Sequence, residues 1–227
     1  MRGLVESKSR LAPVLDQAQR VALNRRLLAR TLAVLGEWHG ALARCIVVSP
    51  CRRALALARE CGAMTLCEGA RAVGLNQAVA LGVAQAAAHG ASHVLILPGD
   101  LPNVGVGALN ALARAAGRRH VVLAPDKTGT GTNALLVEAA ARFEFSFGAA
   151  SLTAHQAAAA RAGLTVRFVR RSELRFDLDT PEDLAACGRA RCPPRGRPAR
   201  PGRKSGFPWG DAGVNMRVNN TPGEEEP

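Results

Sequence analysis

The chain has 227 residues, of which 48% are hydrophobic, and its formal net charge is +12. That length accommodates one α/β domain with a sizeable core, or one domain followed by a tail. No apolar run reaches the roughly 18–20 residues of a membrane span, and the N-terminus lacks the apolar stretch of a secretory signal. The six cysteines show no Cys-x-x-Cys spacing, which favours reduced thiols over structural zinc. We therefore expect a cytoplasmic protein without a membrane partner.

The positive charge is unevenly distributed. Residues 189–227 carry 8 Lys and Arg against 4 Asp and Glu, and Gly or Pro fills 13 of these 39 positions. Such a composition cannot bury enough apolar surface to fold by itself. We therefore expect a folded domain at 1–188 and a disordered basic tail at 189–227. Basic chains often bind nucleic acid, but Phe207 and Trp209 are the tail's only aromatic residues, so a nucleic-acid partner is not the main expectation.

Before the tail, apolar β-branched runs alternate with Ala- and Leu-rich stretches of helical periodicity. Strands are expected at residues 44–49, 64–67, 93–97, 120–124, 133–137 and 164–169. Helices are expected at residues 16–35, 52–61, 74–89, 106–116 and 151–162. Near-continuous apolar strands suit a parallel sheet that is covered on both faces. The pattern therefore predicts an α/β fold with a mostly parallel central sheet and helices on both sides.

Polar turns follow three of the expected strands, at Ser49-Pro50, Pro98-Gly99-Asp100-Leu101-Pro102 and Pro125-Asp126. In open α/β sheets, ligands bind at the carboxyl ends of the strands. Asp100 directly follows an apolar strand, where its carboxylate can hold a divalent cation or can simply stabilise a turn.

A second acidic cluster lies at residues 175–184. Asp177 and Asp179 point to the same side if this segment is extended, and two like charges so close repel unless a cation lies between them. The next residues begin a helix, with Thr180 as N-cap, Pro181 at the first position and Asp183 at the third. This helix start does not explain Asp177 and Asp179.

Three further segments have both an anion-binding and an ordinary interpretation. The loop Gly129-Thr130-Gly131-Thr132-Asn133 brings backbone N–H groups toward a phosphate, or is a flexible hairpin turn. Phe147-Gly148-Ala149-Ala150-Ser151 runs into a helix with Ser151 as the expected N-cap, which is an anion site or a simple cap. Lys8 and Arg10 are solvated charges or the counter-charge of a triphosphate.

Seven segments in fixed order resemble the 2-phospho-L-lactate and phosphoenolpyruvate guanylyltransferase family of coenzyme F-420 biosynthesis. They are Lys8-Ser9-Arg10-Leu11-Ala12-Pro13, Gly74-Leu75-Asn76-Gln77-Ala78, Leu97-Pro98-Gly99-Asp100-Leu101-Pro102, Ala124-Pro125-Asp126, Gly129-Thr130-Gly131-Thr132-Asn133-Ala134-Leu135-Leu136, Phe145-Ser146-Phe147-Gly148 with Ser151, and Phe176-Asp177-Leu178-Asp179-Thr180-Pro181-Glu182-Asp183-Leu184. The resemblance implies a glycosyltransferase-A-like nucleotidyltransferase, similar to nucleotide-diphospho-sugar transferases. It also implies GMP transfer from GTP to the phosphate of phosphoenolpyruvate, 3-phospho-D-glycerate or 2-phospho-L-lactate, with release of pyrophosphate.

The resemblance also assigns roles to particular residues. It implies that Asp100, Asp177 and Asp179 are catalytic and hold Mg²⁺, and that Thr132, Gly148 and Ser151 contact the phosphorylated acid. It places Lys8, Arg10 and Asn76 toward the nucleotide. The five histidines fall outside these motifs, and an ionised phosphate nucleophile needs no general base.

The resemblance further implies a first strand at the centre of the sheet. Only seven residues precede Lys8, so we expect that strand to be largely missing. Two alternatives stay open: a related nucleotidyltransferase such as a molybdopterin guanylyltransferase-like enzyme, whose Gly-rich first loop is absent here, and an inactive paralogue with a nucleic-acid-binding tail. A homo-oligomer is left open.

Overall fold

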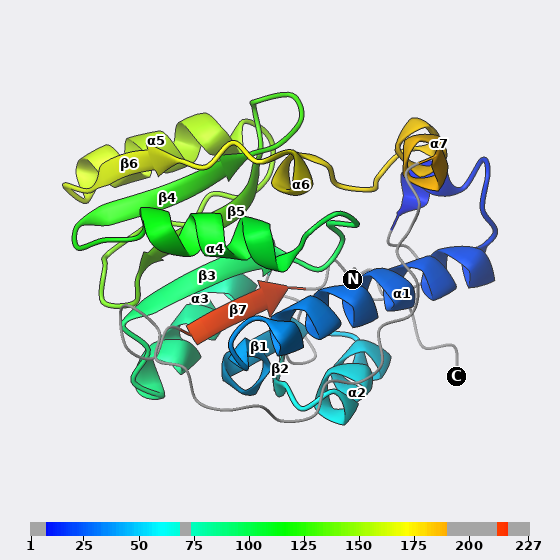
Figure 1. Cartoon of the computed structure of the whole chain (residues 1–227), viewed down its shortest axis with the longest axis horizontal. Helices are drawn as coiled ribbons and strands as arrows, with labels where there is room; N and C mark the ends of the chain where they lie inside the picture. The colour runs from blue at the N-terminus through cyan, green and yellow to red at the C-terminus, as the bar shows by residue number, and fades with distance from the viewer. Residues whose placement is uncertain (1–7, 69–73, 190–212, 218–227) are drawn as a thin grey trace.

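The computed structural model describes residues 8–68, 74–189 and 213–217 (Figure 1). In this part of the chain, one seven-stranded sheet has the order β2-β1-β7-β3-β5-β4-β6. Its strands are β1 Cys45–Ser49, β2 Met64–Cys67, β3 His93–Pro98, β4 His120–Pro125, β5 Thr132–Glu138, β6 Thr165–Phe168 and β7 Gly213–Arg217. All six strands expected before the tail are present, with bounds within two residues of the prediction.

The helices also follow the expected order. They are α1 Gln17–Glu37, α2 Arg52–Glu60, α3 Leu75–Ala88, α4 Val106–Ala115, α5 Ser151–Arg161, α6 Ser172–Arg175 and α7 Pro181–Arg189, with short 3-10 helices at Ser9–Leu11 (η1) and Ala41–Arg44 (η2). None of the helices among the described residues has the length and apolar character that a membrane crossing requires.

The sheet is mostly parallel, as predicted, with one reversed strand. β5 runs antiparallel to both β3 and β4, whereas the other neighbouring pairs are parallel. The start of β5 therefore lies beside the carboxyl ends of β3 and β4, and Thr132 pairs with Pro125 at this edge. The reversal brings the Gly-rich loop and the ligand-binding edge of the sheet together.

Two apolar layers enclose the sheet. Leu95 and Leu97 of β3 belong to the cluster that packs against α1, α2 and α4, and Val94 and Ile96 belong to the cluster on the opposite face, with α3 and α5. Successive strand residues point to opposite faces, so a wholly apolar strand fills both layers. This burial explains why the strands read as continuous apolar runs.

The centre of the sheet differs from the sequence prediction. Residues 189–227 were expected to be disordered, but residues 213–217 form β7, which lies between β1 and β3 and runs parallel to both (Figure 1). Disorder was predicted from the average composition of 39 residues, and such an average does not reveal a single five-residue strand. β7 takes the central position that the resemblance assigns to a first strand. Residues 1–7, which precede Lys8, lie outside the described residues.

Candidate active site

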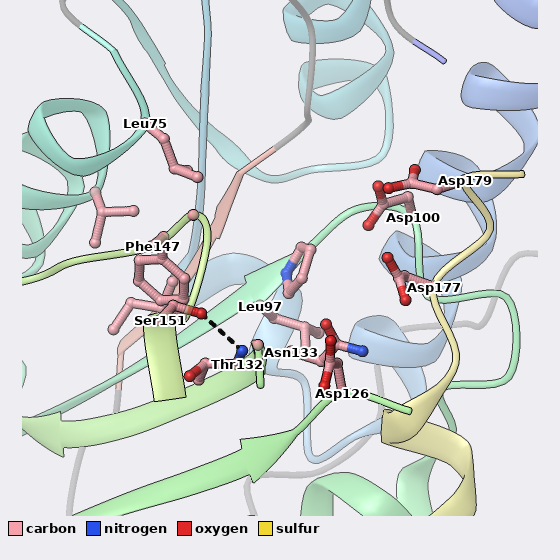
Figure 2. A pocket seen from close by; sticks show the side chains of 15 residues that line it. Leu75, Leu97, Asp100, Asp126, Thr132, Asn133, Phe147, Ser151, Asp177 and Asp179 are labelled. Atoms are coloured by element: carbon pink, nitrogen blue, oxygen red, sulfur yellow. Dashed lines mark hydrogen bonds between the residues drawn. The ribbon is translucent and has the colours of Figure 1, made fainter. Parts of the chain in front are cut away.

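A pocket of about 260 Å³ opens at the carboxyl edge of the sheet. It is near the lower end of the range for small-molecule sites. Six of the nine predicted site residues line it, namely Asp100, Asp177, Asp179, Thr132, Gly148 and Ser151. Figure 2 shows the three aspartates gathered at one end and Ser151 and Thr132 at the other. The pocket therefore has an acidic end and a hydroxyl end.

At the acidic end, a lysine lies between two carboxylates. The Lys8 ammonium contacts Asp100 Oδ2 at 2.9 Å and Asp179 Oδ1 at 2.7 Å, and only 3% of its side chain is exposed. Burial works to lower the pKa of Lys8, but the charges of Asp100 and Asp179 outweigh it and raise the pKa. Lys8 is therefore a buried cation, held by two of the predicted metal ligands.

A small apolar cluster fixes this arrangement. Leu11, Leu27 and Leu178 bury their side chains together beneath the acidic end, which ties the segment after Lys8 to the segment that carries Asp177 and Asp179. The Leu178 N–H also donates to the Asp100 carbonyl at 3.4 Å. Because Leu178 points into this cluster, its two aspartate neighbours point away from it and into the pocket.

The start of α7 holds Asp179 in place. The Thr180 hydroxyl accepts from the Asp183 N–H at 3.3 Å, and the Asp183 carboxylate accepts from the N–H groups of Thr180 and Asp179 at 2.9 and 3.1 Å. These bonds confirm the predicted helix start, in which Thr180 is the N-cap. Asp183 also pairs with Lys127, whose side chain is 43% exposed, so a half-buried ion pair supports the carboxylate that holds the backbone beside Asp179.

Asp177 is the third carboxylate. Burial raises its pKa, and the charges of Asp179 and Asp100 raise it further. Nevertheless, no group of three or more His, Cys, Asp or Glu side chains in the described ranges is spaced to hold a metal ion. The donors are the oxygen ligands that Mg²⁺ prefers, and an ammonium already takes the position of a cation between two of them. The chemistry of the donor set fits a divalent cation, and the Lys8 contacts would have to open to admit it.

At the hydroxyl end, β5 and α5 meet. The Thr132 N–H donates to Ser151 Oγ at 2.9 Å (Figure 2), and His155 Nδ1 lies 3.0 Å from Thr132 Oγ1. The prediction that Ser151 caps α5 is wrong: Ser151 is its first residue, and the N-cap is Ala150, with φ 53° and no side-chain cap. The Ser151 hydroxyl instead accepts from β5 and lines the pocket.

Asn76 of α3 clamps the loop that carries Gly148. Its Nδ2 donates to the Phe147 carbonyl at 3.2 Å, and its Oδ1 accepts from the Phe147 N–H at 2.7 Å. Gly148 follows with φ 133°, a conformation that residues with a Cβ rarely adopt. The structure shows Asn76 as a support of this loop, and its predicted contact with the nucleotide stays a prediction.

Asp126 organises the Gly-rich loop between β4 and β5. Its carboxylate accepts from the Thr130 N–H at 3.1 Å and from the Thr128 hydroxyl at 2.9 Å. Burial works to raise its pKa, but these bonds and the one with Gly131 outweigh it and lower the pKa. A Cβ on Gly131 would lie only 2.7 Å from the Asp126 carboxylate, so a larger residue there would displace this carboxylate from its position.

One pocket residue and one residue that contacts the pocket lining were missed as functional candidates, and one predicted residue lies elsewhere. Asp126 lines the pocket and was visible as a polar residue after a strand. His155 contacts the pocket residue Thr132 and was visible as the residue four positions after Ser151, on the same helical face. Arg10 is exposed and is not among the residues lining this pocket.

The fold is that of a nucleotidyltransferase: a mostly parallel sheet with carboxylates and hydroxyls lining a pocket at its carboxyl edge. A solved structure from Desulfovibrio desulfuricans, described as a candidate nucleotide-diphospho-sugar transferase, has a TM-score of 0.64 and covers 81% of this chain and 80% of that one, at 18% identity. This similarity confirms the predicted fold class.

The family model for CofC-like guanylyl transferases matches residues 2–187, and the chain belongs to this family. It is 41% identical to a phosphoenolpyruvate guanylyltransferase of Rubrobacter xylanophilus, over 82% of this chain and 89% of the relative. It is 37% identical to a 3-phospho-D-glycerate guanylyltransferase of Phenylobacterium zucineum, over 85% of this chain and 88% of the relative. The predicted family and enzyme class, a guanylyltransferase, are confirmed.

Proposed function

We propose that this enzyme transfers GMP from GTP to the phosphate of a small phosphorylated carboxylic acid, phosphoenolpyruvate first, and releases pyrophosphate. The observation that carries the proposal is the two-ended pocket, in which Asp100, Asp177 and Asp179 face Thr132, Gly148 and Ser151. Both relatives described above are named for acids of this kind, and coenzyme F-420 biosynthesis is the corresponding role.

The reaction follows from the charges involved. An oxygen of the acid's phosphate attacks the α-phosphorus of GTP, the new P–O bond forms, and the bond to the pyrophosphate leaving group breaks. Because this oxygen is already ionised at neutral pH, catalysis depends on alignment and charge neutralisation rather than on a base. The side chains at the hydroxyl end hold the acceptor phosphate by hydrogen bonds. Lys8 offers positive charge at the opposite end of the pocket.

We further propose that Asp100, Asp177 and Asp179 hold Mg²⁺. Bound there, Mg²⁺ supplies the positive charge that lowers the repulsion between the acceptor phosphate and the α-phosphate. Their carboxylates are the matching hard oxygen donors, and the raised pKa of Asp177 reflects, after burial, the neighbouring negative charges that such a cation would offset.

The test is pyrophosphate release with GTP, Mg²⁺ and one acid at a time: phosphoenolpyruvate, 3-phospho-D-glycerate or 2-phospho-L-lactate. We expect release that requires both GTP and one of these acids, with the fastest rate for phosphoenolpyruvate. ATP in place of GTP is the matched control for the base. Release that is independent of every acid would show hydrolysis and contradict the proposal.

A further inference from the structure

We infer that His155 is a positioning residue for the acceptor acid: it holds the Thr132 hydroxyl so that the proton of that hydroxyl points into the pocket. The inference rests on the proposed function for the identity of the anion that this proton meets. The hydrogen bonds of the two imidazole nitrogens determine which of them carries the proton.

The backbone sets the role of one ring nitrogen. The Ser146 N–H lies 3.1 Å from His155 Nε2, and a backbone N–H can only donate, so Nε2 accepts. A neutral imidazole carries its single proton on the other nitrogen when one nitrogen accepts. Nδ1 is therefore protonated, and it donates to Thr132 Oγ1 at 3.0 Å.

The surroundings keep the ring neutral and immobile. His155 has no exposed surface, and burial lowers its pKa to about 4. The rings of Phe147 and Phe143 flank it, with centroids 4.6 and 5.8 Å away. Packing therefore fixes the ring orientation, and at neutral pH only one tautomer satisfies the Ser146 N–H.

This arrangement determines the hydrogen-bonding roles of two hydroxyl groups, those of Thr132 and Ser151. A hydroxyl has one proton to donate and lone pairs that accept. Thr132 Oγ1 accepts from His155, and Ser151 Oγ accepts from the Thr132 N–H. Within the described part of the chain, neither hydroxyl donates to a protein acceptor, and both side chains line the pocket. Thr132 and Ser151 are buried residues, 7% and 2% exposed, and the hydroxyls of both are thus arranged to donate to a bound anion.

The first test needs no substrate. Nitrogen-15 NMR of histidine-labelled enzyme assigns the tautomer of His155 by comparison with the His155→Asn variant, which lacks its signal. We expect the Nδ1-protonated neutral form at pH 7. The Nε2-protonated form, or a charged ring, would overturn the inference even if the enzyme proved inactive with every acid.

The second test is a double-mutant cycle on the acid's KM. We expect His155→Phe, which keeps the aromatic packing, to raise the KM for phosphoenolpyruvate about tenfold, as expected for about 1.4 kcal/mol of lost hydrogen bonding. The KM for GTP should stay unchanged. Thr132→Val should give a similar increase, and the double variant should be no worse than Thr132→Val alone, because His155 acts through this hydroxyl.

His155→Asn, which retains an N–H near the position of Nδ1, should recover most of the loss, and the exposed His89→Phe is the matched control. Multiplicative effects in the double variant, or equal increases in both KM values, would show that His155 acts by another route. A wild-type enzyme without any acid-dependent turnover would instead contradict the proposed function, and the tautomer measurement would still decide the inference.

Discussion

At the residue scale, the acidic end of the pocket carries three carboxylates, and a single buried ammonium neutralises only part of their negative charge. One buried ammonium, that of Lys8, faces the carboxylates of Asp100 and Asp179, and Asp177 stands beside them with a raised pKa. Removing one partner of a buried ion pair leaves an uncompensated charge, which is strongly destabilising. The Mg²⁺ proposed above would offset the negative charge that Lys8 leaves unbalanced.

This balance predicts the behaviour of Lys8→Gln. Without the ammonium, the carboxylates repel, and we expect the free energy of unfolding in EDTA to fall by about 3 kcal/mol. Added Mg²⁺ should raise the free energy of unfolding of this variant more than that of the wild type. In the variant, Mg²⁺ replaces the lost positive charge and does not have to displace the Lys8 ammonium from the carboxylates.

Chemical denaturation with and without Mg²⁺ measures both effects. Arg161→Gln is the control, since it breaks an exposed ion pair with Glu144 that involves no pocket residue, and it should gain no extra stabilisation from Mg²⁺. An equal response of both variants to Mg²⁺ would argue against a metal on Asp100 and Asp179.

At the element scale, the pocket is held together by contacts between segments that are distant in sequence. Asn76 of α3 grips the backbone of Phe147 with both ends of its amide, and Ser151 of α5 accepts from the first residue of β5. These contacts place the Gly148 loop against the end of the sheet. The loop's position therefore depends on α3 as much as on α5.

The clamp predicts the effect of Asn76→Ala. Two hydrogen bonds are lost, each contributing about 1 kcal/mol, so the loop should become mobile and the KM for the acid should rise at least fivefold. The KM for GTP should change less, because Phe147 and Gly148 lie at the hydroxyl end.

Steady-state kinetics with each substrate varied in turn provides the measurement. Gln77→Ala, one residue further along α3, is the matched control and should leave both KM values unchanged. A rise confined to the KM for GTP would instead support the original prediction that Asn76 contacts the nucleotide.

The sequence predicted the elements better than the contacts between them. Apolar runs such as 93–97 predict a buried strand because a strand covered on both faces has no polar side. Because Asp100 follows this strand in the sequence, its location at the ligand-binding edge of the sheet could be predicted. By contrast, the bond between His155 and Thr132 joins residues 23 positions apart, and no local pattern encodes it. The N-cap of α5 was misplaced by one residue because cap preferences favour serine, whereas Ala150 holds the cap position; the predicted contact of Ser151 with the acid stays a prediction.

At the scale of the whole molecule, the sheet depends on a strand from the far end of the chain. β7 pairs with β1 on one side and β3 on the other, so it closes the gap between the two halves of the sheet. It lies beyond residues 2–187, which the family model matches. Because β7 is hydrogen-bonded on both sides, it stabilises both neighbouring strands. One of these is β3, and the site lies at the end of this strand.

The position of β7 predicts different outcomes for two truncations. Deleting residues 213–227 removes the strand and should lower the Tm by at least several degrees, because β1 and β3 each lose a hydrogen-bonded neighbour. Deleting residues 218–227 retains the strand and should leave the Tm close to that of the full chain. Calorimetry of both proteins tests this, and an identical Tm would show that β7 does not support the sheet.

At the level of the reaction, we propose that the pocket joins the α-phosphate of GTP to the phosphate of a small acid. Phosphorus NMR of a reaction with GTP, phosphoenolpyruvate and Mg²⁺ tests it most directly. We expect pyrophosphate together with two coupled signals from a new diphosphate that links GMP to the acid. We also expect Asp179→Asn to slow the appearance of these signals at least a hundredfold, or about 2.7 kcal/mol. Formation of GDP and inorganic phosphate without the coupled signals, or full activity of Asp179→Asn, would contradict it.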